Sequence, residues 1–353
     1  MVLLWTTGVG LLALIASYVL VALAVRQGHR AGLVDAPRAG EVQVRSVPRT
    51  GGYGMLGAVW IAVALAVLGR PTELQANPAD DWKLLGMLLG TAAILPLAII
   101  DDRRRLGSAA QFAGQIVIAA IPVAFGLRIG SVASPFGPAQ ELPQWLDILV
   151  TVIWIVGMIN AINLIDTMDG LAGGLALIGA CVLSLRSLWF GQYTIAVLPL
   201  ALAGSTLGFL PHNFWPARIF MGTSGSMLLG FWLATTSIVG GAKVGTALVV
   251  MGVPILDTAW VIGRRLAAGR SPFHGGDGEH LPHRIHRLGL SQKHTVLVLY
   301  GICAVFGLLA LTLHSPAERP TMVKLYLIAG MVLVMAMVLI TVTVLSSRRR
   351  TAS

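Results

Sequence analysis

The chain has 353 residues, of which 56% are hydrophobic and only 11% are charged. Its mean hydropathy is +0.80. Because soluble domains carry about 25% charged residues, this composition excludes a soluble protein and indicates a membrane protein. The formal net charge is +10, but the bases are divided among short loops between apolar segments. That distribution favours contact with anionic lipid headgroups and argues against nucleic acid as a partner.

Eleven apolar segments, each close to the ~20 residues that span a bilayer, recur along the whole chain. The first is too long for a cleaved secretory signal and lacks a small-residue cleavage site, so we expect it to stay. We predict an all-α, polytopic integral membrane protein with a single domain over 1–353. In chain order the segments are 3–25, 52–69, 84–100, 109–126, 146–163, 171–187, 194–210, 225–240, 243–262, 295–313 and 323–345.

Basic residues gather in alternate loops, which the positive-inside rule places in the cytoplasm. The loop 26–51 holds five arginines, further bases lie in 101–108 and 263–294, and the chain ends in Arg348, Arg349 and Arg350. The intervening loops are poorer in bases. Eleven spans then put the N-terminus outside and the C-terminus in the cytoplasm, with every basic cluster on the cytoplasmic side.

Acidic and amide residues gather at the predicted cytoplasmic helix ends. Because a charged residue at the centre of a membrane helix costs about 2.5–3.5 kcal/mol, acidic residues in or near the membrane need a reason. One interpretation of the aspartate pair after the third segment is a polar helix terminus beside arginines. The group after the fifth segment repeats at intervals of three, so we expect it on one side of a helical turn. Such a face suits a cation or a nucleoside. The residues are Asp101, Asp102, Asn160, Asn163, Asp166, Asp169 and, in the ninth segment, Asp257.

The long polar loop after the ninth segment is rich in histidine and arginine. It contains His274, Asp277, His280, His283, Arg284, His286 and Arg287. The loop could be merely solvated, or it could bind zinc through histidines at intervals of three. Pro282 argues against a regular helix there. We favour a phosphate-binding loop, since arginine and histidine donate to oxyanions.

Carboxylate and amide oxygens are the ligands that Mg²⁺ prefers, and Mn²⁺ is an alternative. Together with a basic loop on the same membrane face, they indicate phosphoryl transfer from a nucleotide-activated donor to a lipid acceptor.

The same motifs, in series, resemble the polyprenyl-phosphate N-acetylhexosamine-1-phosphate transferases, or glycosyltransferase family 4. These bacterial enzymes start O-antigen, teichoic acid and arabinogalactan linkers, and include the peptidoglycan lipid I synthase. The likeness covers about 33–290. It rests on Gly32 to Pro37, Pro48 to Gly52, Asp101-Asp102, Gln115, Asn160 to Gly170, Asn213 to Gly222, Pro254 to Asp257 and Asp277 to Leu288. The form His280-Leu-Pro-His283-Arg284 is closer to the N-acetylglucosamine branch than to the lipid I synthases.

The resemblance implies transfer of a sugar-1-phosphate from a UDP-N-acetylhexosamine to polyprenyl phosphate, with release of UMP, at the bacterial plasma membrane. It implies catalytic or acceptor-side roles for Asp101 and Asp102, and a part in holding Mg²⁺ for Asn163. Nucleotide- and sugar-binding roles are implied for Asn160, Asp166, Asp169, Asn213, His280, His283 and Arg284. Small-residue patches can pack helices within one chain or between two, so a homodimer stays open.

Several positions depart from the family pattern. Thr223 stands where the family has an aspartate that binds Mg²⁺, and Gln111 stands where a lysine is usual. Pro282 replaces a histidine, while Gly40, Glu41 and Gln43 replace a basic stretch. A neutral hydroxyl is a weak magnesium ligand, and 211–226 contains no acidic residue that could take its place.

Three hypotheses follow. The first is an active transferase with an altered metal site. It is favoured because the other polar residues of the site are all present: Asp101, Asp102, Asn163, Asp166 and Asp169. The second is a catalytically silent relative that binds a nucleotide sugar or polyprenyl phosphate. The third is an unrelated transporter or channel, which would place its polar residues near the membrane midplane.

Overall fold

The computed structural model describes 1–35, 46–74, 77–132, 140–239, 244–271, 278–312 and 321–352. Gly40, Glu41, Gln43, His274 and Asp277 lie outside these residues.

The described residues form α-helices and two very short hairpins. The helices are α1 (Val2–Arg30), α2 (Gly51–Leu68), α3 (Pro78–Arg104), α4 (Ser108–Ala124), α5 (Gln144–Ile165), α6 (Leu171–Trp189), α7 (Tyr193–Asn213), α8 (Gly222–Ile238), α9 (Val244–Val250), α10 (Gly252–Ala267), α11 (Leu281–Arg287), α12 (Gln292–Thr312) and α13 (Thr321–Ala352). In the hairpins, β1 (Val34–Asp35) pairs antiparallel with β2 (Val47–Pro48), and β3 (Ser131–Val132) with β4 (Gln140–Glu141).

The sequence at the ends of α3 shows why a helix forms there. Asn77 caps its start, accepting a 3.1 Å hydrogen bond from the Ala79 amide, and Pro78 occupies the first helical position, where no donor is lost. Acidic residues in the first turn and arginines in the last complement the helix dipole. The helix therefore continues past the predicted 84–100 and carries Asp101 and Asp102 in its last turn.

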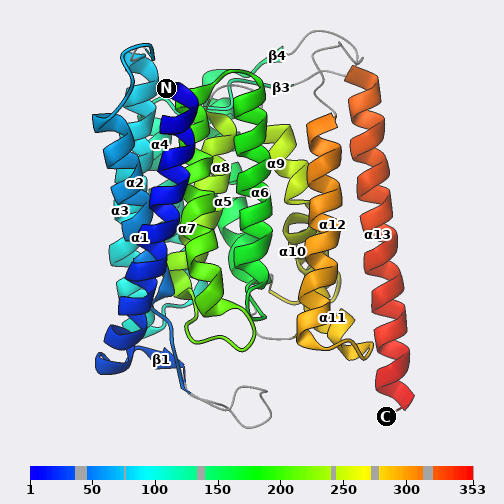
Figure 1. The fold of residues 1–353 in the computed structure, drawn as a ribbon. Helices are drawn as coiled ribbons and strands as arrows, with labels where there is room; N and C mark the ends of the chain where they lie inside the picture. Colours follow the sequence, from blue (N-terminus) through cyan, green and yellow to red (C-terminus); the bar gives the residue numbers. More distant parts are fainter. Residues whose placement is uncertain are drawn as a thin grey trace.

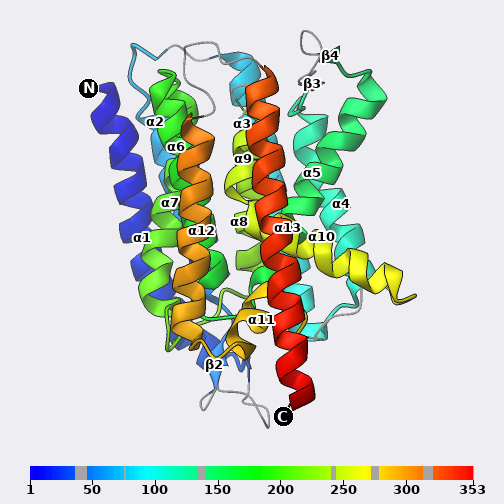
Figure 2. The ribbon, with the colours of Figure 1, turned by 90° about the vertical axis from the view of Figure 1, so that its right-hand side faces the viewer.

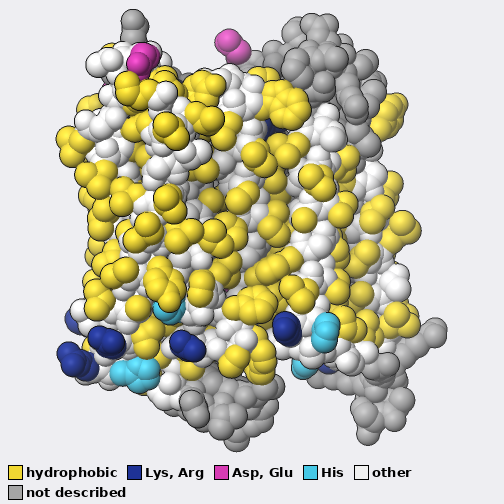
Figure 3. Space-filling model, in the orientation of Figure 1, with side chains coloured by type: hydrophobic (Ala, Val, Ile, Leu, Met, Phe, Trp, Pro, Cys, Tyr) yellow, Lys and Arg dark blue, Asp and Glu magenta, His cyan; other side chains and the backbone are white. Residues whose placement is uncertain are grey.

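The long helices run up and down in one bundle, and the two chain ends lie at opposite ends of it (Figure 1). On the face in view, Lys, Arg and His side chains gather at the lower end and acidic side chains at the upper end. Hydrophobic side chains cover the surface between them (Figure 3). This distribution is typical of a protein that crosses a membrane.

Every predicted segment overlaps a helix, or in one case a pair of helices. Among the described residues, eight helices are long and apolar enough to cross a membrane, or nine with the bent pair α9–α10. The helices α4 and α8 have 17 residues each. The all-α membrane architecture is therefore confirmed, while the count of eleven and the orientation stay predictions.

The ninth segment differs from the single span that hydropathy predicts. The chain bends by 75° between α9 and α10, at Met251. Pro254 explains the break, because proline has no amide to donate to the carbonyl four residues earlier and its ring clashes with that carbonyl. Beyond the bend, α10 crosses the bundle obliquely, behind α13 in Figure 2.

The centre of the bundle is α8, in which every residue from Thr223 to Ile238 is buried. Its glycines allow close packing: a Cβ on Gly52 of α2 would lie 2.1 Å from the Gly225 nitrogen. The indole N–H of Trp232 donates to the Thr91 hydroxyl of α3 at 2.9 Å. The first turn of α8 is thus fixed at the lower end of the bundle, beside the last turn of α3.

Candidate active site

Asp101 is enclosed by three hydrogen-bond donors and is only 5% exposed. Its Oδ1 accepts from the Leu106 amide at 2.9 Å and from Gln111 Nε2 at 2.7 Å. Its Oδ2 accepts from the Thr223 hydroxyl at 2.5 Å. Gln111 and Thr223, two of the positions at which the sequence departs from the expected family pattern, therefore meet at the same carboxylate, one on each oxygen.

Asp102 has a different environment from its neighbour. Its Oδ2 accepts a 2.5 Å hydrogen bond from the Tyr53 hydroxyl of α2. Its Oδ1 is buried and accepts no hydrogen bond from the described part of the chain. Within the described ranges, the guanidinium of Arg49 is the cation nearest to Oδ1, at 3.9 Å. A buried carboxylate oxygen without a donor is costly, so this atom suits a cation or an acidic proton from outside the chain.

The two asparagines of α5 lie near the same end of the bundle. Asn163 Oδ1 accepts a 2.9 Å bond from the Ser226 hydroxyl, which also lies 3.3 Å from the Thr223 carbonyl oxygen. Asn160 donates to Gln115 of α4 at 2.5 Å. Asn163 is therefore one side chain removed from Thr223, whereas Asn160 fixes the contact between α4 and α5.

The predicted helical face of amides and carboxylates is only half correct. The helix α5 ends at Ile165, and Asp166 is its C-cap with ψ of 64°, so the two aspartates lie in the following turn. Asp169 is held there by the Ala217 amide, which donates to Oδ2 at 3.0 Å. The turn itself is fixed by Asn213, whose Oδ1 accepts from the Gly170 amide at 3.0 Å.

Burial raises the pKa of both aspartates in this turn. For Asp166 the pKa rises to about 7, chiefly through burial and then through the negative charge of Asp169. For Asp169, burial raises the pKa and the bond from the Ala217 amide opposes the rise. A positive group bound beside these two carboxyls would therefore stabilise their ionised forms.

A second cluster is centred on Asp257, which is fully buried. Its Oδ1 accepts from the Leu281 amide and from Arg284 Nη2, and its Oδ2 meets His280 Nδ1, all at 2.8 Å. An ionised carboxylate can only accept, so Nδ1 carries the proton and Nε2 is left for another partner. Asp257 therefore orients the imidazole of His280.

Arg284 holds the last helix against this cluster. It is 1% exposed and donates through Nη1 to the Thr343 hydroxyl of α13 at 2.5 Å. Its guanidinium is thus engaged with Asp257 and α13, which suits a positioning role for Arg284.

The short helix α11 differs from the irregular loop that Pro282 predicts. Pro282 occupies its second position, where a missing amide costs nothing. Burial, followed by the positive charge of Arg287, lowers the pKa of His283. Among the residues with described positions, no three His, Cys, Asp or Glu side chains form a group that could hold a metal.

A cation at Asp102 would therefore depend on mixed oxygen ligands. Asp101, Asp102 and Asn163 supply carboxylate and amide oxygens, and Thr223 a hydroxyl, which are the ligand types that Mg²⁺ accepts alongside phosphate and water. The unpartnered Oδ1 of Asp102 is the structural observation that fits such an ion.

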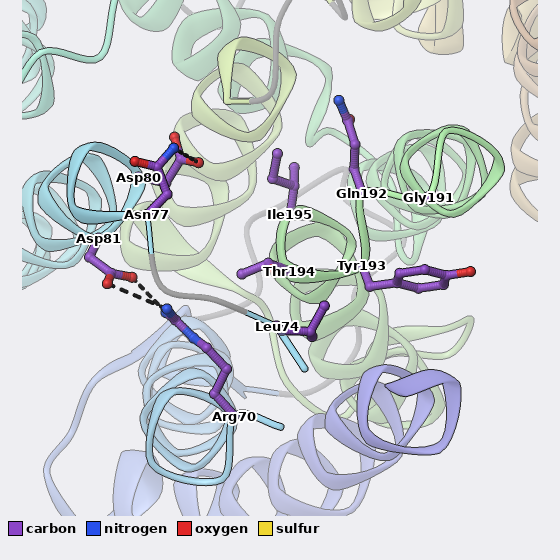
Figure 4. Close-up of a pocket in the computed structure, with 10 residues that line it drawn as sticks. All are labelled: Arg70, Leu74, Asn77, Asp80, Asp81, Gly191, Gln192, Tyr193, Thr194 and Ile195. Atoms are coloured by element: carbon purple, nitrogen blue, oxygen red, sulfur yellow. Dashed lines mark hydrogen bonds and ion pairs between the residues drawn. The ribbon is translucent and has the colours of Figure 1, made fainter. Parts of the chain in front are cut away.

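The cavity drawn in Figure 4 lies elsewhere, at the opposite end of the bundle, with a volume of about 140 Å³. It is bordered by the start of α3 and the turn between α6 and α7. Arg70 and Asp81 pair with each other at 2.5 Å there. Asp81 and Asp101 are separated by twenty residues of α3, about 30 Å. This cavity is remote from the polar site.

Sequence reasoning missed the partners of the aspartate pair. Gln111 is recognisable in the sequence only as a departure from the family pattern, and Arg49 only as part of the Pro48 to Gly52 motif. Tyr53, which directly follows that motif, and Ser226 carry no signal of their own. The site lies at helix ends at one end of the bundle, which favours the transferase hypotheses over a transporter with polar residues at the midplane.

The chain is similar to known proteins along most of its length. The profile of the family described as glycosyl transferase family 4 matches residues 84–241. The chain is 34% identical over 311 residues to a Bacillus subtilis protein named probable undecaprenyl-phosphate N-acetylglucosaminyl 1-phosphate transferase, covering 86% of this chain and 84% of that protein. It is 36% identical over 358 residues to the decaprenyl-phosphate N-acetylglucosaminephosphotransferase of Mycobacterium leprae, covering 92% and 88%. It is 29% identical over 299 residues to the phospho-N-acetylmuramoyl-pentapeptide-transferase of Desulforudis audaxviator, covering 76% and 86%.

Proposed function

The chain belongs to glycosyl transferase family 4, and from that premise we propose that it transfers N-acetylglucosamine-1-phosphate from UDP-N-acetylglucosamine to a polyprenyl phosphate. UMP is the second product, and the reaction takes place at the cytoplasmic face of the bacterial plasma membrane. The names of the relatives support the sugar and the lipid acceptor. The basic end of the bundle supports a site that receives phosphates (Figure 3).

In the proposed reaction, an oxygen of the polyprenyl phosphate attacks the phosphorus that bears the sugar. The bond from that phosphorus to the bridging oxygen of the diphosphate breaks, and UMP leaves with that oxygen. Because phosphoryl transfer needs little covalent help from the protein, catalysis rests on positioning and on charge stabilisation.

Asp102 carries this proposal. Its buried Oδ1 has no donor among the described residues, and Arg49, 29% exposed, lies 3.9 Å away with donors to spare. We assign Asp102 to the acceptor phosphate, either taking its proton or holding it through a shared cation, and Arg49 to a phosphate oxygen. Mg²⁺, or Mn²⁺, bound between Asp101, Asp102, Asn163 and the diphosphate would neutralise the donor.

The turn after α5 and the helix α11 supply the donor side. Asp166 and Asp169 lie where hydroxyls of a nucleoside or a sugar could donate to them. His280, oriented by Asp257, keeps Nε2 available for a phosphate oxygen. Asn213 and Arg284 act through their neighbours, because the amide of Asn213 and both terminal nitrogens of Arg284 already bind protein atoms.

The test is UMP release by the purified protein with UDP-N-acetylglucosamine, undecaprenyl phosphate and Mg²⁺. We expect turnover that is lost in Asp102→Asn and in the presence of EDTA. Equilibrium binding of the donor should be weakened much less than turnover by Asp102→Asn, since Asp101 and Asn163 would still hold the cation on the diphosphate. Turnover unaffected by Asp102→Asn would contradict the assignment.

One observation favours the second hypothesis, a silent binding protein. The Thr223 hydroxyl donates to Asp101, so the hydrogen-bonding capacity of both groups is partly used within the protein. A silent relative would bind UDP-N-acetylglucosamine or polyprenyl phosphate without releasing UMP under any donor or acceptor tested. Binding measured beside turnover separates the two.

A further inference from the structure

The carboxylate of Asp101 is held from two sides by side chains that carry no charge. Gln111, from α4, bonds one oxygen and Thr223, from α8, bonds the other. The third donor, the Leu106 amide, is also neutral. Asp101 and Thr223 are 5% and 7% exposed, so water contributes little to this arrangement.

Two side chains that bind opposite oxygens of one buried carboxylate are energetically coupled. An acidic group in place of Thr223 would remove a donor and set a second negative charge against Asp101. Gln111, being neutral, offers nothing to offset that charge. A lysine in its place would offset it, because an ammonium would then bind the other oxygen of Asp101.

We propose that Gln111 and Thr223 are a matched pair of positioning residues that hold Asp101 through neutral donors, so that Thr223→Asp is tolerated only together with Gln111→Lys. The inference rests on the proposed function for its catalytic part. It makes Thr223→Asp harmful by itself, although an aspartate is the better magnesium ligand.

The experiment is a double-mutant cycle on the full-length protein: the parent, Gln111→Lys, Thr223→Asp and the double variant. Melting temperature is measured in EDTA, and UMP release is measured with Mg²⁺, with kcat and KM separated. Thr223→Ser keeps the hydroxyl and Thr223→Val removes it at nearly the same size, so these two variants isolate the hydrogen bond.

We expect Thr223→Asp to lower the melting temperature in EDTA and to lower kcat at least ~10-fold, with the double variant recovering most of both losses. We expect Thr223→Ser to stay closer to the parent than Thr223→Val. A positioning role predicts that the losses fall mainly on kcat, whereas a merely structural role would lower the melting temperature and leave the kcat of the folded protein unchanged.

The inference is overturned if the effects of the two substitutions are additive, or if Thr223→Asp alone raises turnover. If neither the parent nor any variant releases UMP, the proposed function fails. In that case the melting cycle in EDTA still decides whether Gln111 and Thr223 act on Asp101 together, so the two failures are distinguishable.

Discussion

Replacing Asp257 with alanine should destabilise the protein more than any other loss of a single side-chain contact described above. The carboxylate is fully buried and accepts three hydrogen bonds at 2.8 Å, one of them from Arg284, which is 1% exposed. Without Asp257, the guanidinium keeps Thr343 but loses its counter-charge. Breaking a buried pair on one side costs about 3–5 kcal/mol.

Three further variants make this estimate a sharp test. Asp257→Leu with Arg284→Met removes both charges, so it should cost less than Asp257→Ala alone, since no unpaired charge is left buried. Thr343→Val should cost about 1–3 kcal/mol, because it removes one bond to a charged group. The matched control is Arg264→Gln, which changes a residue of α10, the helix that carries Asp257. It breaks a 3.6 Å ion pair with Glu279, in which the arginine side chain is 44% exposed, and it should cost at most about 1 kcal/mol.

The measurement is the free energy of unfolding in mixed micelles, read from the loss of helical circular dichroism as denaturing detergent increases. The expected order of destabilisation is Asp257→Ala first, then Thr343→Val, then Arg264→Gln. If Asp257→Ala and Arg264→Gln unfold within about 1 kcal/mol of each other, the cluster does not hold α10, α11 and α13 together and the reasoning fails.

Three other outcomes follow from the structure. Tyr53→Phe should lower UMP release about 10- to 100-fold, because the buried Asp102 loses its hydroxyl donor; unchanged kinetics would count against it. Gly52→Ala should prevent accumulation of folded protein, since its Cβ would meet the backbone of α8, while Gly263→Ala, with open space around it, should express normally. In EDTA, Asp166 of the folded protein keeps its proton up to its raised pKa of about 7, whereas Asp166 of the unfolded chain loses it at about pH 4. The contribution of Asp166 to folding stability is therefore present at low pH and lost as the pH rises through 7. Melting curves from pH 4 to 8 should therefore be flatter for Asp166→Asn.

The fold could be predicted from the sequence as far as hydropathy reaches. A long apolar segment must be helical in a bilayer, so each of the eleven segments overlaps a helix. Hydropathy averages over a window and does not register a single proline, which is why the bend at Met251 was missed. The helix α11 was missed for a related reason: the effect of a proline depends on its position in a helix, and Pro282 lies in the first turn, where proline is tolerated.

The family was also predictable, and the comparisons confirm it, because several short motifs in series are specific. The contacts within the site were not. Thr223 lies 122 positions from Asp101, and Tyr53 lies 49 from Asp102. Contacts at such separations are set by how helices pack, which one sequence does not reveal. The roles of the individual site residues stay predictions.

The two buried aspartates of the site are balanced in different ways, and the difference bears on the metal. Asp257 has a full counter-charge in Arg284, whereas Asp101 has three neutral donors. Its neighbour Asp102 has a tyrosine hydroxyl and an arginine at 3.9 Å, too distant for a hydrogen bond. Among the described residues, neither carboxyl of this adjacent pair therefore has a hydrogen-bonded counter-charge, which is expensive for a carboxylate in a poorly hydrated place. No cationic side chain in the described part of the chain bonds Asp101, so a positive group bound there from outside the chain would balance the pair. In the proposed reaction, a divalent ion bound with the diphosphate of the donor would supply that charge.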